Sequence, residues 1–543
     1  MKRSSRSIVI AVVRYLVRAF DDAKVSALLA ARPFRAELPL GIDRTKRIAA
    51  VLILAGAAGC APVTFRPTKL PEPVSAEAKS CGEVFESVDR AVVESGASDG
   101  MAAPVDGFPY LRVNRFLASY AKDDLNDAQF RDWVQRMAAL ALKSYEIETS
   151  NLSEERRKQL TQRLRRLDPE YSSPRSAVAN CSARLAKLDL AAPARRQRLR
   201  EVARMPDEYL TWQRIVGLYW ITQVPFAAGV EGWHQRAQET FNRPISELSV
   251  AGVLIDYMPP RNADTIDVRP ILVRSSNNPL GIPDPHGQDR DALFRAFAPI
   301  FIVDTAGDWD RPGRLGWDGN EVPTVTVGNP LVYRRVSHTR YKGHALLQLN
   351  YGIWFTERPK SKGWDILGGH LDGVIWRVTL SPDGEVLMFD SIHQCGCYHQ
   401  FFPTPLASLK RSCETLEESA FVPQTLPRVA PGTRVSVRLA SGTHYIDRII
   451  VGKPSSGASV LYEFEEDDVL RSMPLAGGGT KSVFRPDGVV PGSERAERYF
   501  FWPMGVPEPG AMREWGRHAT AFIGRRHFDD ADVIERDFEL RLQ

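Results

Sequence analysis

Apolar residues recur at helical spacing through the first half of the chain. In 153–167, three leucines lie three and four residues apart, which predicts an amphipathic helix capped by Ser150, Asn151 or Ser153. The range 124–145 shows the same spacing and predicts a second helix. The apolar side of that helix consists of Phe130, Trp133, Val134, Met137 and Leu140. We therefore expect a helical domain over residues 80–240.

The range 207–233 is the most apolar helical stretch that follows the N-terminal leader. Arg214 and Gln223 interrupt it, and Pro225 breaks the regular helical pattern. We expect a buried or docking helix that closes the helical domain. The alternative is a segment that dips into a membrane.

The pattern changes after residue 241, where Pro, Gly, Asn and Asp separate short apolar runs. The runs 346–355, 374–380 and 386–392 predict three adjacent antiparallel strands, and the range 433–451 alternates strictly and predicts a β-hairpin. The fold class is therefore α+β: a helical N-terminal domain followed by a larger antiparallel β-rich, sandwich-like region. We divide that region into a β-rich domain at 241–430 and a C-terminal hairpin and loop-rich part at 431–543 that packs on it.

The composition is typical of a globular protein and gives no indication of a nucleic-acid partner. The chain has 543 residues, of which 43% are hydrophobic and 25% are charged. Its 71 basic and 66 acidic residues leave a formal charge of +5, which is small for this length. Arginine runs at 156–166 and 195–204 are interleaved with Glu and Gln, as on a solvated helix face. We therefore expect no nucleic-acid partner.

Residues 46–60 follow the basic, apolar and small-residue order of a secretory signal. The apolar run 48–59 is shorter than the roughly 20 residues that a spanning helix needs. Ala57-Ala58-Gly59-Cys60 resembles a bacterial lipobox, in which the cysteine becomes the lipidated first residue. The resemblance implies a palmitate-bearing lipoprotein, and Ala61 implies sorting to the outer membrane.

We therefore expect residues 1–59 to be a leader and signal segment, and residues 60–79 to be the lipidated cysteine and an extended tether. Translation is expected to start downstream of Met1, because ordinary signals begin within a few residues of their basic region. The expected location is the cell envelope, with the protein facing the periplasm. The expected partners are the membrane, through the lipid, and an envelope protein. A plain signal peptide or a buried apolar helix is the alternative.

An exported protein meets an oxidising compartment, so disulfides are expected. Five cysteines remain once the lipidated one is set aside. We expect Cys81 to pair with Cys181, and Cys413 to pair with Cys395 or Cys397. A strained ring closed by Cys395 and Cys397, a metal site and a buried free thiol remain alternatives for the Cys-Gly-Cys segment.

Histidines and aspartates cluster at the ends of two predicted strands. His370 and Asp372 open the strand 374–380, and Asp390 and His393 lie near the exit of the strand 386–392. Because the start of one antiparallel strand lies beside the end of its partner, these four side chains are expected at one end of the sheet. Two imidazoles with carboxylates suit a divalent metal, best zinc, with an open position for water.

A metal at that place suggests a catalytic function. The ion would lower the pKa of a bound water, and Asp372 or Asp390 would accept its proton. A metal-dependent hydrolase is therefore the alternative to a binding or structural module. The competing interpretation of the cluster is ordinary capping and hydrogen bonding. The acidic loop 304–321 suits calcium less well than the cluster suits zinc, because its spacing differs from an EF-hand.

The chain shows two resemblances to known families, one over most of the mature chain and one confined to about 345–400. GFPYLRVNRFLA at 107–118, GHLDGVIWRVTL at 369–380 and DSIHQCGCYHQFFPT at 390–404 resemble an uncharacterised family of predicted proteobacterial lipoproteins. Across 345–400 the order of strands is similar to necrosis-inducing secreted toxins, a β-sandwich family with a divalent-metal site. Gly369, His370 and Asp372 have counterparts there, but Gly373-Val374 replaces the Trp-Glu of that family. We expect an exported, lipid-anchored envelope protein that acts as a binding or structural module.

Overall fold

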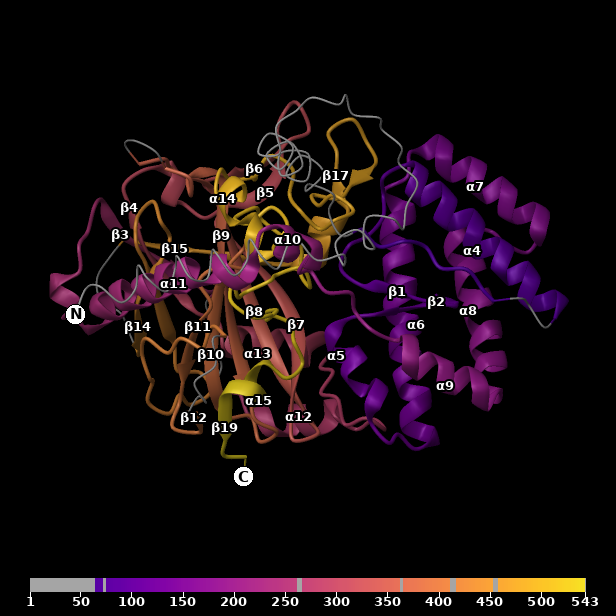
Figure 1. Ribbon diagram of the computed structural model, residues 1–543, viewed down its shortest axis with the longest axis horizontal. Helices are drawn as coiled ribbons and strands as arrows, with labels where there is room; N and C mark the ends of the chain where they lie inside the picture. The colour runs from indigo at the N-terminus through magenta and orange to yellow at the C-terminus, as the bar shows by residue number, and fades with distance from the viewer. Residues whose placement is uncertain are drawn as a thin grey trace, which may run out of the picture. The chain divides into compact units, whose positions relative to one another are not determined.

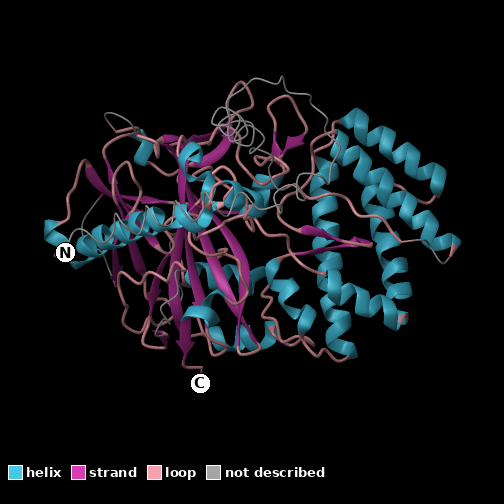
Figure 2. Cartoon of the chain, viewed as in Figure 1, coloured by secondary structure: helices cyan, strands magenta, loops and turns pink. Residues whose placement is uncertain are grey.

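The computed structural model describes residues 64–71, 75–260, 266–361, 365–410, 417–452 and 458–542. Residues 1–59, Cys60 and Cys413 lie outside these ranges. Helices concentrate in the first part of the described chain and strands in the later part (Figure 1; Figure 2), so the predicted α+β class is confirmed.

The first part packs helices around a short hairpin. Its elements are α4 (Ala76–Glu94), β1 (Ala103–Val105), β2 (Phe108–Val113), α5 (Arg115–Ala118), α6 (Asp127–Ser150), α7 (Glu154–Leu167), α8 (Pro174–Ala191) and α9 (Pro193–Val202). Helix α6 begins at the capping box of Asn126 and Gln129, and Ser153 caps α7. Helix α6 buries Phe130, Trp133, Val134 and Met137 as the sequence predicts, and Leu140 is partly buried. The hairpin β1–β2 was not predicted.

A disulfide joins two helices of this part. Cys81 in α4 and Cys181 in α8 are both fully buried, their Cα atoms are 5.2 Å apart, and the predicted pairing is confirmed. The cross-link closes a sequence separation of 100 residues. The segment 64–71, part of the predicted tether, is not helical, and its Phe65 and Leu70 pack against the same core.

The later part contains two large sheets. The six-stranded sheet has the order β11-β10-β9-β8-β7-β16 and is antiparallel except where β16 pairs with β7. Its strands are β7 (Leu331–Tyr341), β8 (His344–Arg358), β9 (Gly369–Leu380), β10 (Val386–His393), β11 (Gln400–Pro403) and β16 (Glu463–Glu466). The three predicted adjacent strands are thus β8, β9 and β10, and their antiparallel pairing is confirmed.

The second large sheet is mixed, with the order β14-β13-β4-β3-β15. Its strands are β3 (Val253–Met258), β4 (Ile300–Thr305), β13 (Val435–Leu439), β14 (Ile446–Val451) and β15 (Ala458–Leu461). Strands β13 and β14 form the predicted hairpin. Strand β13 also pairs in parallel with β4, so strands from both predicted ranges, 241–430 and 431–543, belong to this sheet.

One hydrophobic core contains side chains of both sheets, together with α12 (Val268–Ser275) and α13 (Gly287–Ala296). The other face of the six-stranded sheet is covered by C-terminal segments, including α15 (Val533–Asp537) and β19 (Phe538–Leu540), which pairs with β12 (Ala407–Leu409). Strand β10 is therefore buried at every position, and polar residues on both of its faces must find partners inside the protein. Short strand pairs are β5 (Arg314–Trp317) with β6 (Pro323–Thr326) and β17 (Met473–Pro474) with β18 (Thr480–Lys481).

Helices α10 (Thr211–Val216) and α11 (Tyr219–Asn242) follow the helical part but contact the β-rich part. Helix α11 contacts β14 and the 3-10 turn η5 (Trp502–Met504), which follows α14 (Arg498–Phe501). The range 207–233, for which we expected one helix that closes the helical domain, thus contributes two helices that contact the β-rich part. Pro225, which we expected to break the pattern, lies inside α11. Among the described helices, none combines the length and apolar character required to span a membrane.

Buried ion pairs connect the helical and β-rich parts. Arg471, which ends the 3-10 turn η4 (Asp467–Arg471), donates from Nε and Nη2 to the two carboxylate oxygens of Asp99 at 2.8 and 2.5 Å. Both side chains are 1% exposed. Arg115 of α5 similarly contacts Asp529 at 3.0 Å. The described residues 64–542 accordingly belong to one compact unit.

Candidate functional site

The four residues of the predicted metal site lie in three different environments. Asp372 and His393 share the inner face of the sheet, with Oδ1 and Nδ1 3.5 Å apart. Asp390 lies on the opposite face, because it is three positions from His393 and alternate strand residues point in opposite directions. His370 is half-buried, and its Nε2 lies 2.7 Å from the carbonyl oxygen of Pro323.

The backbone explains why His370 is separated from Asp372. Leu371, which lies between them, has a φ of 58°, so the chain is not extended at this point. Two residues that flank such a position need not point to the same side. The predicted four-residue cluster is therefore not formed, and no group of three or more His, Cys, Asp and Glu side chains in the described ranges is arranged to hold a metal ion.

Asp372 instead belongs to a buried network that connects the two large sheets. Its Oδ2 is 2.8 Å from Nδ1 of His444, which lies in the turn between β13 and β14. His444 Nε2 is 3.3 Å from Oδ1 of Asp310, in the 3-10 turn η3 (Asp308–Asp310) after β4. The His444 ring stacks on Phe355 of β8 at a centroid distance of 3.9 Å. The imidazole of His444 thus lies between Asp372 of β9 and Asp310 of the turn that follows β4.

The pKa values follow from this arrangement. Burial opposes ionisation of Asp372, but its contacts with His393 and His444 hold its pKa well below the ordinary value. Burial alone would lower the pKa of His444, but Asp310 and Asp372 outweigh it and raise that pKa. His393 has a lowered pKa because burial dominates its contact with Asp372. His444, whose pKa is raised by the carboxylates on both sides of its ring, therefore belongs to a structural network that connects the two sheets.

Asp390 forms a second network on the outer face. It accepts hydrogen bonds from Nε and Nη2 of Arg377 at 2.9 and 2.5 Å, and it lies 2.9 Å from Nε2 of His399. The Arg377 guanidinium lies 3.6 Å from the ring centroid of Phe528. Burial lowers the pKa of His399 to about 4. These groups neutralise each other inside the protein, which accounts for charged residues at fully buried positions of β9 and β10.

The predicted calcium loop is also satisfied by the protein itself. Asp310 accepts hydrogen bonds from the backbone N–H groups of Ala306 and Gly442 and from the Ser441 hydroxyl. Asp318 accepts from two backbone N–H groups of its own turn. Neither the zinc nor the calcium prediction therefore has a fitting ligand set in the described part of the chain, and the hydrolase loses its candidate site.

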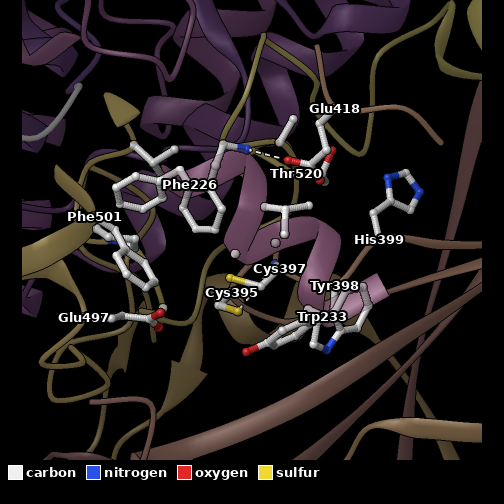
Figure 3. A pocket seen from close by; sticks show the side chains of 18 of the residues that line it. Phe226, Trp233, Cys395, Cys397, Tyr398, His399, Glu418, Glu497, Phe501 and Thr520 are labelled. Carbon is white, nitrogen blue, oxygen red and sulfur yellow. Dashed lines mark hydrogen bonds between the residues drawn. The ribbon is translucent and has the colours of Figure 1, made fainter. Parts of the chain in front are cut away.

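A different site lies between α11 and the turn 395–399. A cavity of about 440 Å³ is covered on one side by α11, which contributes Phe226, Val230 and Trp233 at spacings of four and three residues. Figure 3 shows Tyr398 beside Trp233, and their ring centroids are 5.0 Å apart. The helix therefore presents one apolar face to the cavity.

The other walls come from distant parts of the sequence. Phe501 of α14 and Phe522 from the C-terminal loop form a cluster with Phe226, with centroid distances of 5.2, 5.5 and 6.2 Å. Glu418 and Thr520 also line the cavity (Figure 3). The Phe522 backbone N–H donates to Glu418 Oε2 at 3.0 Å, which fixes that carboxylate at the rim.

Glu497 places a carboxyl group in the wall of this cavity (Figure 3). Glu497 is 5% exposed. Burial raises the pKa of Glu497 to about 7, although the nearby Arg495 and Arg358 partly offset this effect. Gly510 has a φ of 81°, and a Cβ atom at this position would overlap Glu497 Oε1. Because its pKa is raised, the Glu497 carboxyl remains protonated at mildly acid pH, where it can donate a hydrogen bond to a ligand atom.

Cys395 and Cys397 lie in a tight turn at the same cavity (Figure 3). The Cys397 N–H group lies 3.4 Å from Cys395 Sγ. Gly396 has a φ of 91°, and a Cβ there would approach Ala519 O to 2.6 Å, so this turn requires glycine. The Cys395 contact, with burial, raises the pKa of the Cys397 thiol well above its ordinary value. Both cysteines are free in the structure, and the predicted pairing with Cys413 lies outside the described residues.

Comparison with known proteins adds no assignment, since the chain matches no family model, no curated protein and no solved structure. The two resemblances stated above therefore stay predictions. Sequence reasoning placed Cys395 and Cys397 among the candidate residues but missed Glu497, Phe501 and Thr520. The spacing of Phe226, Val230 and Trp233 was the one available signal, because it indicates an apolar face on the helix.

Proposed function

We propose that this protein is an exported, lipid-anchored envelope protein that works as a binding module, with the cavity beneath α11 as its ligand site. The lipobox ending at Cys60 supports export and acylation. The disulfide between Cys81 and Cys181 is of the kind that persists in oxidising compartments, and it supports the same location. An outer-membrane position follows from Ala61 by the sorting rule for such lipoproteins.

The observation that carries the binding proposal is an aromatic cavity with the buried, protonatable carboxyl of Glu497 in its wall. Its volume of about 440 Å³ lies within the range of roughly 300–1,000 Å³ that is usual for small-molecule sites. Phe226, Trp233 and Phe501 supply apolar surface, and Glu497 supplies a polar contact at a fixed place. The ligand class is an apolar chain or ring system with one hydrogen-bond acceptor near Glu497.

Binding can be tested with N-phenyl-1-naphthylamine, a neutral apolar fluorophore, and the exported chain that begins at Ala61. Gly229 lines the cavity, and a Cβ added there meets no atom within 4 Å, so Gly229→Phe adds a ring at the cavity without a backbone clash. Ala228→Phe adds the same ring to an exposed neighbouring position and is the matched control.

We expect Gly229→Phe to weaken fluorophore binding at least about tenfold, because a ring occupies volume that the ligand needs. Ala228→Phe should bind like the wild-type protein. The proposal fails if the wild-type chain does not bind the fluorophore, or if both variants bind it equally well.

A further inference from the structure

An apolar surface lies beside the cavity on α10, α11 and α14. We call it the apolar face, and it consists of the exposed side chains of Ile215, Leu218, Trp220, Ile221, Val224, Tyr499 and Phe500. Val224 and Ile215 are 63% and 68% exposed, which is unusual for large aliphatic side chains grouped on neighbouring elements. A surface of this kind needs a partner that is itself apolar.

On α10 and α11 the apolar face carries almost no charge, whereas on α14 the Arg498 guanidinium donates to the Tyr499 hydroxyl at 2.9 Å. Arg214 is the only charged residue in the sequence 211–230. Its guanidinium turns inward, where Nε donates to Met504 O at 2.8 Å and Nη2 donates to Gly524 O at 2.6 Å. Trp220 and Tyr499 have amphipathic aromatic side chains, and such side chains are enriched at the boundary between lipid and water. These features suit a phospholipid surface.

The elements under the apolar face are closely packed. The 3-10 turn η5 contacts α10, α11 and α14. A Cβ at Gly217 would lie 2.6 Å from Pro503 Cβ, so the backbones approach closely at this point. The Leu210 N–H donates to Gly505 O at 2.7 Å. The exposed side chains are therefore held on one fixed platform.

The N-terminal side of the described chain begins near this platform. The Arg517 guanidinium lies 4.4 Å from the Phe65 ring centroid, and Arg517 also forms an ion pair with Glu208 at 3.1 Å. Glu208 precedes α10 by three residues. Five extended residues span at most about 18 Å, so a lipid on Cys60 is attached within that distance of Phe65.

We propose that the apolar face docks on the phospholipid surface of the membrane that receives the Cys60 lipid. The inference rests on the proposed function for the lipid anchor, and it assigns the orientation of the protein on that membrane. Phe501 directly follows Phe500 of the apolar face in sequence, Phe226 lies two residues after Val224, and both Phe226 and Phe501 line the cavity. Docking therefore places the cavity beside the bilayer, and the ligand class it favours is the acyl chain of a membrane lipid.

The test uses the mature lipidated protein in vesicles of phosphatidylethanolamine and phosphatidylglycerol. Some vesicles contain phospholipids with bromine on one acyl chain, which quenches the fluorescence of a tryptophan in contact with it. The measured quantity is the difference in emission between plain and brominated vesicles, for the wild-type protein and for Trp220→Phe. Trp220 is 49% exposed, so this conservative change should leave the fold intact. Trp317→Phe, on β5 and outside the apolar face, is the matched control.

We expect brominated vesicles to quench the wild-type protein by about a tenth of its emission through Trp220, one of eleven tryptophans, and by up to about a tenth more where an acyl chain in the cavity contacts Trp233. Trp220→Phe should lose the part of the quenching that comes from Trp220, and Trp317→Phe should keep all of it. Equal quenching of the wild-type protein and Trp220→Phe overturns the proposal, and so does a protein that does not float with the vesicles. Fluorophore binding is measured separately on the same variants. Quenching at Trp220 without fluorophore binding would reject the cavity as a ligand site and leave the proposed role of the apolar face intact. Fluorophore binding without quenching at Trp220 would reject the role of the apolar face alone.

Discussion

Replacement of Glu497 by Gln isolates the free energy of burying a carboxyl in the cavity wall. The pKa of Glu497 rises from 4.5 to about 7, chiefly because burial disfavours the charged form. In the unfolded chain this carboxyl ionises near its ordinary value, whereas the folded protein keeps the proton up to about pH 7. The stability that depends on the protonated group is therefore fully present below pH 4.5 and is lost as the pH rises through 7.

The magnitude follows from proton linkage. Stability changes by about 1.4 kcal/mol for each pH unit in which the folded state holds one proton more than the unfolded state. Between pH 4.5 and about 7 the wild-type protein should therefore lose roughly 3 kcal/mol through Glu497. Gln has nearly the same shape and remains neutral. Glu497→Gln should match the wild-type protein near pH 4.5 and exceed its stability by about 3 kcal/mol at pH 8.

The assay is urea unfolding of both proteins at intervals from pH 4.5 to 8.5. Subtraction at each pH removes the contributions of other buried carboxyls, because both proteins contain them. A stability difference that is independent of pH, or one that favours the wild-type protein as pH rises, would refute the assignment of a buried and neutral Glu497. A rising difference that levels off above pH 7 would support it.

Three further outcomes are expected. Replacing Cys81 and Cys181 together with Ala should lower the free energy of unfolding by about 4–5 kcal/mol, because the cross-link closes a 100-residue loop; urea unfolding measures this, and equal stability of oxidised and reduced wild-type protein would contradict it. Arg471→Met should cost about 3–5 kcal/mol, since it leaves a buried aspartate without its partner, whereas Arg156→Met in an exposed ion pair should cost less than about 1 kcal/mol; similar losses for both would reject the assigned role of burial. Cys60→Ser should abolish incorporation of labelled palmitate in cells, and undiminished labelling would place the lipid elsewhere.

For the predicted metal site, strand periodicity predicted the strands correctly but not which side chains lie together. Periodicity identified β8, β9 and β10 and their antiparallel order, and the structure adds the register, in which Asp390 pairs with Arg377 and His393 with Val374. The positions of Asp390 and His393 differ by three, so alternation alone requires opposite faces. The separation of His370 had no comparable signal, because the positive φ at Leu371 is set by surrounding contacts.

Local patterns in the sequence determined the parts of this protein that depend on neighbouring residues. They include the start of α7 at Ser153, the apolar side of α6 and the hairpin β13–β14, because caps, helical spacing and strand alternation act over a few residues. The partner of Cys81 was inferred from compartment and count, and the fold bears it out.

Only the tertiary structure decided which distant groups share an environment. It placed His444 between Asp310 and Asp372, and it placed Glu497 against the cavity beneath α11. Burial at these places changes the free energy of a charge by several kcal/mol. That environment is created by the packing of segments that are far apart in the sequence. The spacing of residues along the chain does not show which of these segments come into contact.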